Sequence, residues 1–271
     1  MCIRDSYLIP LSLTLGSMLC GWYSIVNSLR GFLEVEDRVR AASLFSGAAW
    51  AIGLAIVLDN LDGRVARTIG ATSAFGVELD SLTDVLTFGV AAAVLAYTSG
   101  YGTAPGLQRP AFIVSFVFLA AGAIRLARAN VHAHSLQPDP SSPEQEERYF
   151  VGLPIPAAAG LVAAVAYFCY SPVAAGRAAE GVRPHSLLLM GMVTLLALLM
   201  VSTFPYSKLK IAARGRKTLS VLNRSVLPAI AVAVALGIWL DSRWVVLTIA
   251  VLYTVHGPIV QVVRGLARRP S

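Results

Sequence analysis

Four aspartates stand close together in a chain that is otherwise strongly apolar. They are Asp59, Asp62, Asp80 and Asp84, and the members of each pair are three or four residues apart. On helices, each of these spacings places both carboxylates on one face. Carboxylate oxygens are the ligands that hard divalent cations such as Mg²⁺ and Mn²⁺ prefer. The pattern therefore predicts a metal site, with enough acids for two ions, where two helix ends meet.

The residues between the two pairs indicate what such a site would bind. An unpaired Asp at the centre of a membrane-spanning helix costs on the order of 2.5 to 3.5 kcal/mol, so a positive partner is needed. Gly63 and Gly76 lack side chains, which permits a ligand to approach closely, and Arg67 is a fork-shaped donor suited to phosphate. Acids that only cap helix ends in a solvated loop are the alternative. The full pattern favours a metal site with room for a diphosphate.

The composition indicates that these acids sit in an integral membrane protein. Of the 271 residues, 56% are hydrophobic and 14% are charged, and the mean hydropathy is +0.68. An ordinary soluble domain is far more polar. Apolar runs long enough to cross the hydrocarbon layer recur along the chain, so we expect an all-α polytopic bundle of about eight transmembrane helices. The expected spans are 7–28, 41–59, 80–99, 109–129, 152–171, 185–204, 225–241 and 243–263.

The distribution of basic residues predicts the orientation of the bundle. If the N-terminus is cytoplasmic, most of the 22 Lys and Arg residues fall in cytoplasmic segments, as the positive-inside rule requires. Both termini and the four acids are then expected at the cytoplasmic face. The net charge of +7 fits a surface that faces anionic membrane lipid. No nucleic-acid partner is expected, because no basic soluble domain is apparent.

The chain is expected to form one membrane domain over residues 7–271. The leading residues 1–6, MCIRDS, fit neither a helix nor a targeting signal, so we assign them no function and do not assume that they are native. Cys2, Cys20 and Cys169 show no metal or redox spacing. We therefore expect no disulfide.

The four acids belong to a longer pattern that resembles a known family. Residues 59–84 read D-x2-D-G-x2-A-R-x8-G-x3-D-x3-D, which matches the signature of the CDP-alcohol phosphatidyltransferases at every position. The resemblance implies a membrane-embedded enzyme that moves a phosphatidyl group from CDP-diacylglycerol to an alcohol and releases CMP. It also implies Mg²⁺ or Mn²⁺ as the cofactor and a homodimer in the membrane. We expect a bacterial-type inner membrane, with the active site facing the cytoplasm.

The resemblance further implies a role for each residue of the pattern. The implied metal ligands are Asp59, Asp62, Asp80 and Asp84. The residues implied to shape the CDP pocket are Gly63, Ala66, Arg67 and Gly76. Asp84 is also implied to be the general base, and the chemistry agrees, because an alcohol is a poor nucleophile until a carboxylate takes its proton.

Other segments predict which alcohol is the acceptor. The segments RLARANV, YFVGLPIPAAAG and LMVSTFPYSKLK resemble blocks of the phosphatidylserine synthase branch of that family, which implies L-serine. Since serine carries a carboxylate, its pocket needs a cation, and Arg125, Arg128 and Lys208 are the expected candidates. Ordinary membrane anchoring is the alternative role for these basic residues.

Two alternative functions remain open at this point. Glycerol 3-phosphate or an inositol phosphate could replace serine as the acceptor in the same chemistry. A more distant alternative is a divalent cation transporter whose path is lined by the four acids.

Overall fold

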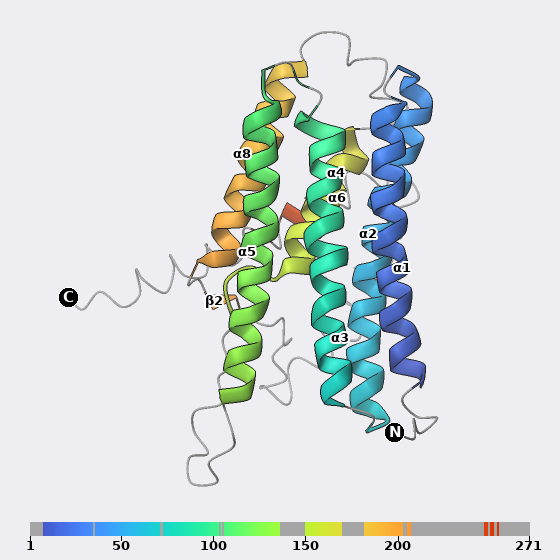
Figure 1. Ribbon diagram of the computed structural model, residues 1–271, viewed down its shortest axis with the longest axis vertical. Helices are drawn as coiled ribbons and strands as arrows, with labels where there is room; N and C mark the ends of the chain where they lie inside the picture. The colour runs from blue at the N-terminus through green and yellow to red at the C-terminus, as the bar shows by residue number, and fades with distance from the viewer. Residues whose placement is uncertain are drawn as a thin grey trace, which may run out of the picture.

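The computed structural model shows an upright bundle of long helices (Figure 1). It describes residues 8–34, 36–70, 73–102, 104, 106–135, 150–169, 182–202, 205–206, 247–248, 250–251 and 254. The helices are α1 (Leu8–Leu33), α2 (Arg38–Thr68), α3 (Ala74–Asp84), α4 (Ala91–Ala96), α5 (Gln108–Ser135), α6 (Ile155–Cys169) and α8 (Val182–Val201), with π-helical segments η2 (Val85–Val90) and η3 (Tyr97–Tyr101). A single antiparallel pair, β1 (Phe150–Val151) and β2 (Pro205–Tyr206), is the only strand pairing among the described residues.

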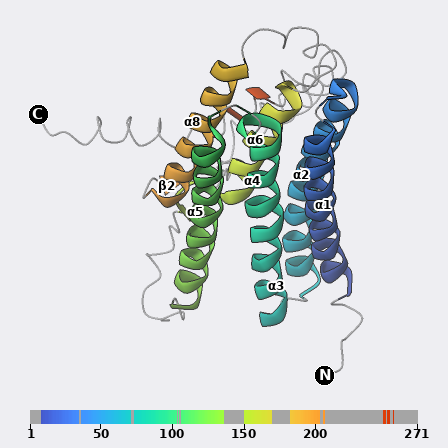
Figure 2. The ribbon, with the colours of Figure 1, turned by 45° about the horizontal axis from the view of Figure 1, so that its top comes forward.

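Helices α1 and α2 form a closely packed hairpin at one side of the bundle (Figure 2). The buried face of α1 carries small polar residues and glycines, among them Ser17, Gly21 and Ser24. Small residues let two membrane helices approach closely. At the turn, Asp37 caps α2 by accepting a hydrogen bond from the backbone N–H of Arg40 at 3.1 Å. This hairpin holds the acid-bearing end of α2 against the start of α1.

The third span runs without a break from Ala74 to Tyr101 through α3, η2, α4 and η3. Ser73 caps its start, since its hydroxyl oxygen accepts from the backbone N–H of Gly76 at 3.0 Å. The π-helical segment η2 begins directly after Asp84, and such segments often occur at functional sites. A Cβ on Gly21 would lie 2.9 Å from the Thr87 Cα atom. Glycine at position 21 is thus required for α1 to pack against η2.

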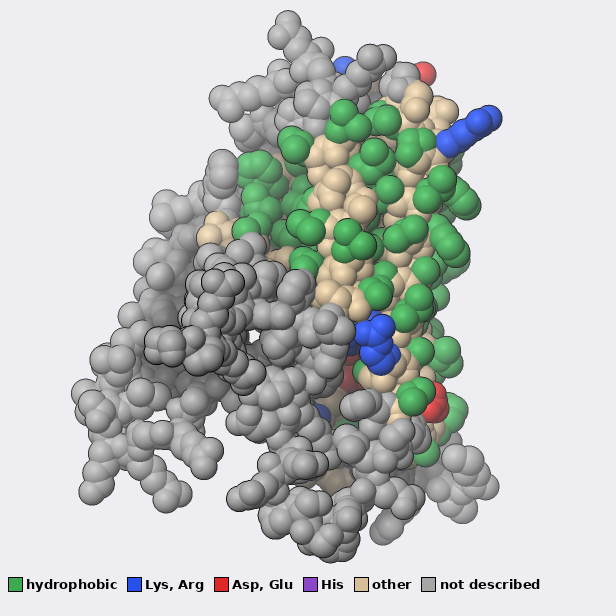
Figure 3. Space-filling model, turned by 90° about the vertical axis from the view of Figure 1, so that its left-hand side faces the viewer, with side chains coloured by type: hydrophobic (Ala, Val, Ile, Leu, Met, Phe, Trp, Pro, Cys, Tyr) green, Lys and Arg blue, Asp and Glu red, His purple; other side chains and the backbone are tan. Residues whose placement is uncertain are grey.

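Helix α6 lies in the interior, between α2 and α4, and α5 packs along α8. Ile155, Ala158, Ala159 and Val162 of α6 are buried, so this helix supplies much of the apolar core. By contrast, hydrophobic side chains cover most of the described surface at the upper right of Figure 3, and the charged side chains in view lie at its top edge and in its lower part. An apolar exterior around an apolar core is the arrangement of a protein embedded in lipid.

The expected all-α membrane architecture is confirmed for the part of the chain that the structure describes. Four helices there are long and apolar enough to cross a membrane, and Ile155–Cys169 and Ser186–Val201 are shorter apolar helices. They correspond to the first six expected spans. The expected spans 225–241 and 243–263 lie outside the described residues, apart from five positions between 247 and 254.

The expected connection over residues 60–79 is wrong for most of its length. Helix α2 continues past the expected end at residue 59 to Thr68, and α3 already begins at Ala74. The reason is that residues 60–69 contain no proline, and the helix ends only where Gly70 takes a φ of 66°. Helix α5 likewise continues to Ser135, beyond the expected end at residue 129.

Candidate functional site

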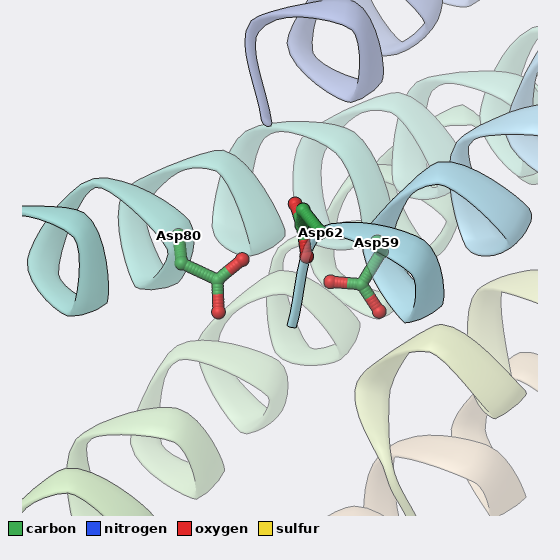
Figure 4. Close-up of side chains that lie close together, drawn as sticks. All are labelled: Asp59, Asp62 and Asp80. Atoms are coloured by element: carbon green, nitrogen blue, oxygen red, sulfur yellow. The ribbon is translucent and has the colours of Figure 1, made fainter. Parts of the chain in front are cut away.

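Three of the four aspartates, from the end of α2 and from α3, come together in space. Asp59 and Asp62 project from the last third of α2, and Asp80 projects from α3. One carboxylate oxygen of each lies within 4.8 Å of the others. Figure 4 shows Asp62 between Asp59 and Asp80, whose carboxylates point toward each other. The spacing within α2 and the short turn between the helices together produce this cluster.

Asp84 stands next to the cluster, one helical turn beyond Asp80. It is partly buried, and its carboxyl group is near enough to that of Asp59 for the two to interact. The guanidinium of Arg125, from α5, lies close enough to attract the Asp84 carboxylate. Helices α2, α3 and α5 therefore all contribute charged groups to one site.

The composition of this site fits a divalent cation. Three carboxylates offer oxygen atoms to one small volume, and oxygen donors are what Mg²⁺ and Mn²⁺ select. A single guanidinium near Asp84 does not offset four carboxylates that repel one another. An ion held by Asp59, Asp62 and Asp80 would supply the missing positive charge.

Asp62 has an additional partner on a third helix. Its side chain is buried, with 5% of its surface exposed. The hydroxyl of Thr14 on α1 donates to Asp62 Oδ2 at 3.0 Å, and Thr14 is itself 7% exposed. Sequence reasoning did not single out Thr14. The available signal was weak, since Thr14 is one of several small polar residues on the face of α1 that packs on α2.

The residues expected to shape a CDP pocket lie between the two pairs of acids in the chain. Gly63, Ala66 and Arg67 follow Asp62 on α2, and Arg67 is exposed. The Arg67 guanidinium covers Gly63, since a Cβ at Gly63 would be 3.8 Å from Arg67 Nη2. Gly76 lies in the first turn of α3, where its N–H binds Ser73. A Cβ there would be 3.2 Å from the Ser73 hydroxyl oxygen, so the absence of a side chain also serves the helix cap.

The structure separates the basic residues expected to bind serine. Arg125 is 8% exposed and interacts electrostatically with Asp84. Arg128 is exposed, and its Nη1 donates to the carbonyl oxygen of Val201 at 3.2 Å, at the end of α8. Lys208 lies outside the described residues.

The match to a family model extends over almost the whole chain. The model described as CDP-alcohol phosphatidyltransferase matches residues 7–256. The chain belongs to the CDP-alcohol phosphatidyltransferase family.

Curated relatives of this phosphatidyltransferase are named CDP-diacylglycerol–serine O-phosphatidyltransferase. One from Helicobacter pylori is 34% identical over 260 residues, which cover 93% of this chain and 97% of that protein. One from Mycobacterium tuberculosis is 31% identical over 269 residues, or 97% of this chain and 82% of that protein. One from Saccharomyces cerevisiae is 41% identical over 148 residues, or 54% of this chain and 49% of that protein. The similarity thus extends well beyond the motif.

The phosphatidyltransferase has an apolar cavity that begins at its acid cluster. The cavity lies between α2 and α6, has a volume of about 610 Å³, and includes Asp59 and Asn60 in its lining. Trp50 and Tyr167, which also line it, meet edge to face with ring centroids 5.6 Å apart. Trp50 and Asp59 are nine positions apart on the helix, which is about 14 Å along its axis. A polar site at one end and an apolar body suit a lipid with a charged headgroup.

Proposed function

We propose that this phosphatidyltransferase transfers the phosphatidyl group of CDP-diacylglycerol to the hydroxyl of L-serine, forming phosphatidylserine and CMP. The observation that carries this proposal is the cluster of Asp59, Asp62 and Asp80 at the polar end of an apolar cavity. The headgroup diphosphate would lie at the acids, and an apolar tail would follow the cavity between α2 and α6. The names of the curated relatives support serine as the acceptor.

The reaction exchanges one phosphorus–oxygen bond for another. The serine hydroxyl oxygen forms a bond to the phosphorus that carries diacylglycerol, and the bond from that phosphorus to the CMP phosphate breaks. Asp84 takes the hydroxyl proton as attack begins. Its place near the cluster supports this role, because the base must reach the serine hydroxyl as that group attacks the phosphorus.

Asp59, Asp62 and Asp80 would hold Mg²⁺ or Mn²⁺, with Asp84 as a further ligand and two ions in the complete site. Bound there, the cation would offset the negative charge of the diphosphate and of the leaving CMP. Gly63, Ala66, Arg67 and Gly76 would line the CDP pocket. Arg67 is exposed at this end of α2, so its guanidinium is free to turn toward a phosphate oxygen.

Arg125 is the residue that we propose to bind the serine carboxylate. In serine, the hydroxyl and the carboxylate are only two carbon atoms apart, so the base and the carboxylate-binding cation must be neighbours. Arg125 is near enough to Asp84 to interact with it electrostatically, which supports this pairing. Arg128 instead binds the end of α8, which supports a structural role for it.

The membrane arrangement of the enzyme is also part of the proposal. We expect eight transmembrane helices, both termini in the cytoplasm, and a homodimer in a bacterial-type inner membrane. The acids would then lie at the cytoplasmic face of the membrane. The basic bias of the expected cytoplasmic segments supports this orientation.

The test is an assay of the purified protein in detergent with CDP-diacylglycerol and Mg²⁺ or Mn²⁺. CMP release and phosphatidylserine formation that both depend on L-serine would support the proposal. Glycerol 3-phosphate or inositol phosphate in place of serine tests the other acceptors. If CMP is released only with one of these compounds, that compound is the acceptor and L-serine is not. Uptake of Mn²⁺ into proteoliposomes without CMP release would instead favour a transporter.

A further inference from the structure

Asp62 is more enclosed than the two acids beside it. Asp59 and Asp80 are partly exposed, whereas Asp62 is buried. The hydrogen bond from Thr14 reaches it from α1, 48 positions earlier in the chain. Because both side chains are buried, this contact is shielded from water, where such a bond is stronger than at a surface.

The Thr14 hydroxyl has two acceptors within reach but only one proton. Asp62 Oδ2 lies at 3.0 Å, and the carbonyl oxygen of Pro10, one turn earlier in the same helix, lies at 3.1 Å. A carboxylate is the stronger acceptor, since hydrogen bonds to ionised groups are about twice as strong as neutral ones. The proton is therefore directed to Asp62.

We infer that Thr14 is a positioning residue for the metal site: its hydroxyl fixes the orientation of the Asp62 carboxylate for cation binding. This inference rests on the proposed metal site. The hydrogen bond occupies one lone pair of Oδ2 and restrains rotation of the carboxylate, while the remaining lone pairs stay available to a cation. Groups that orient a metal ligand typically contribute about 10- to 100-fold to metal affinity or activity.

Ser17 supplies a matched control on the same helix. It lies three residues after Thr14, is 1% exposed, and donates to the carbonyl oxygen of Ala55 on α2 at 3.5 Å. Thr14 and Ser17 thus both place a buried hydroxyl between α1 and α2. Only Thr14, of these two, contacts a carboxylate of the cluster.

The experiment measures Mn²⁺ binding to the full-length protein in detergent, without substrate, by electron paramagnetic resonance of free Mn²⁺. Thr14→Val keeps the shape of the side chain and removes its hydroxyl, and Thr14→Ser keeps the hydroxyl. We expect Thr14→Val to weaken Mn²⁺ affinity by about tenfold or more. Thr14→Ser and Ser17→Ala should bind Mn²⁺ as the wild type does. Thr14→Ala serves as a second hydroxyl-free variant if the valine variant does not fold.

Three results would overturn the inference. Wild-type affinity in a hydroxyl-free Thr14 variant would show that the hydroxyl does not position Asp62. An equal loss in Ser17→Ala would assign the effect to general packing between α1 and α2. A wild-type protein that binds no Mn²⁺ would remove the metal site itself, and CMP release by that same preparation would show whether the transferase activity stands without it.

Discussion

Arg128 Nη1 donates a hydrogen bond to the carbonyl oxygen of Val201, 3.2 Å away, where α8 ends. A cation at this position satisfies a carbonyl that has no partner within its helix and interacts favourably with the negative end of the helix dipole. Arg125, only three residues earlier, is buried and interacts electrostatically with Asp84 instead. Two arginines that lie one helical turn apart on α5 therefore have different partners.

Because their partners differ, substitution of Arg125 and substitution of Arg128 should affect different properties of the enzyme. Arg125→Ala should raise the KM for serine roughly tenfold or more, because a hydrogen bond to a charged group contributes about 1.5–3 kcal/mol. The KM for CDP-diacylglycerol should change little. Arg128→Ala should leave the serine KM near the wild-type value. It should lower the free energy of unfolding by about 0.3–1 kcal/mol. Steady-state kinetics and thermal unfolding of both variants check this, and equal effects on serine KM would contradict it.

Replacement of the proposed base should remove turnover without removing donor binding. Asp84→Asn keeps the size of the side chain but cannot accept the serine proton, so kcat should fall by about 10²- to 10⁴-fold. Binding of CDP-diacylglycerol, measured by calorimetry, should persist. Glu78→Gln is the matched control, because Glu78 is an exposed acid on the same helix. Near-normal turnover by Asp84→Asn would exclude Asp84 as the base.

Removal of divalent cations should reversibly inactivate the enzyme. A chelator such as EDTA should abolish CMP release, and added Mg²⁺ or Mn²⁺ should restore it, because the acid cluster then regains the positive charge that offsets its repulsion. The cation should also raise the unfolding temperature of the wild type, since a ligand that binds only the folded state stabilises it. Asp80→Asn should reduce this stabilisation. Full activity in excess EDTA would argue against a metal-dependent reaction.

Filling the apolar cavity should weaken binding of the lipid donor selectively. Gly53 lines the cavity, and a Cβ added there would meet nothing within 4 Å. Gly53→Leu should therefore fold and should raise the KM for long-chain CDP-diacylglycerol several-fold, by about 1 kcal/mol of lost apolar contact, with less effect on a short-chain donor. Serine KM should stay constant.

Gly191→Leu is the control for this substitution. Gly191 lies on α8, outside the cavity lining, and a Cβ there would also meet nothing within 4 Å. Its donor KM should equal that of the wild type. Equal changes in the two variants would show that the cavity does not hold the lipid.

The sequence alone was sufficient for the membrane class, the approximate positions of the described helices and the grouping of the acids. These properties depend on short-range regularities. An apolar run predicts a membrane-spanning helix when its length matches the thickness of the bilayer. A spacing of three or four residues predicts that two side chains share one face of a helix. That is why the pairing of Asp59 with Asp62 could be predicted without a structure.

Only the tertiary structure decided which of the neighbouring residues reach the site. The association of Thr14 with Asp62 depends on how α1 packs on α2, and the divergence of Arg125 and Arg128 depends on where α3 and α8 lie around α5. Residues on a helix three positions apart differ in direction by about 60°. That angle is enough to point one arginine at the acids and the other at a helix end, and packing between distant segments determines which is which.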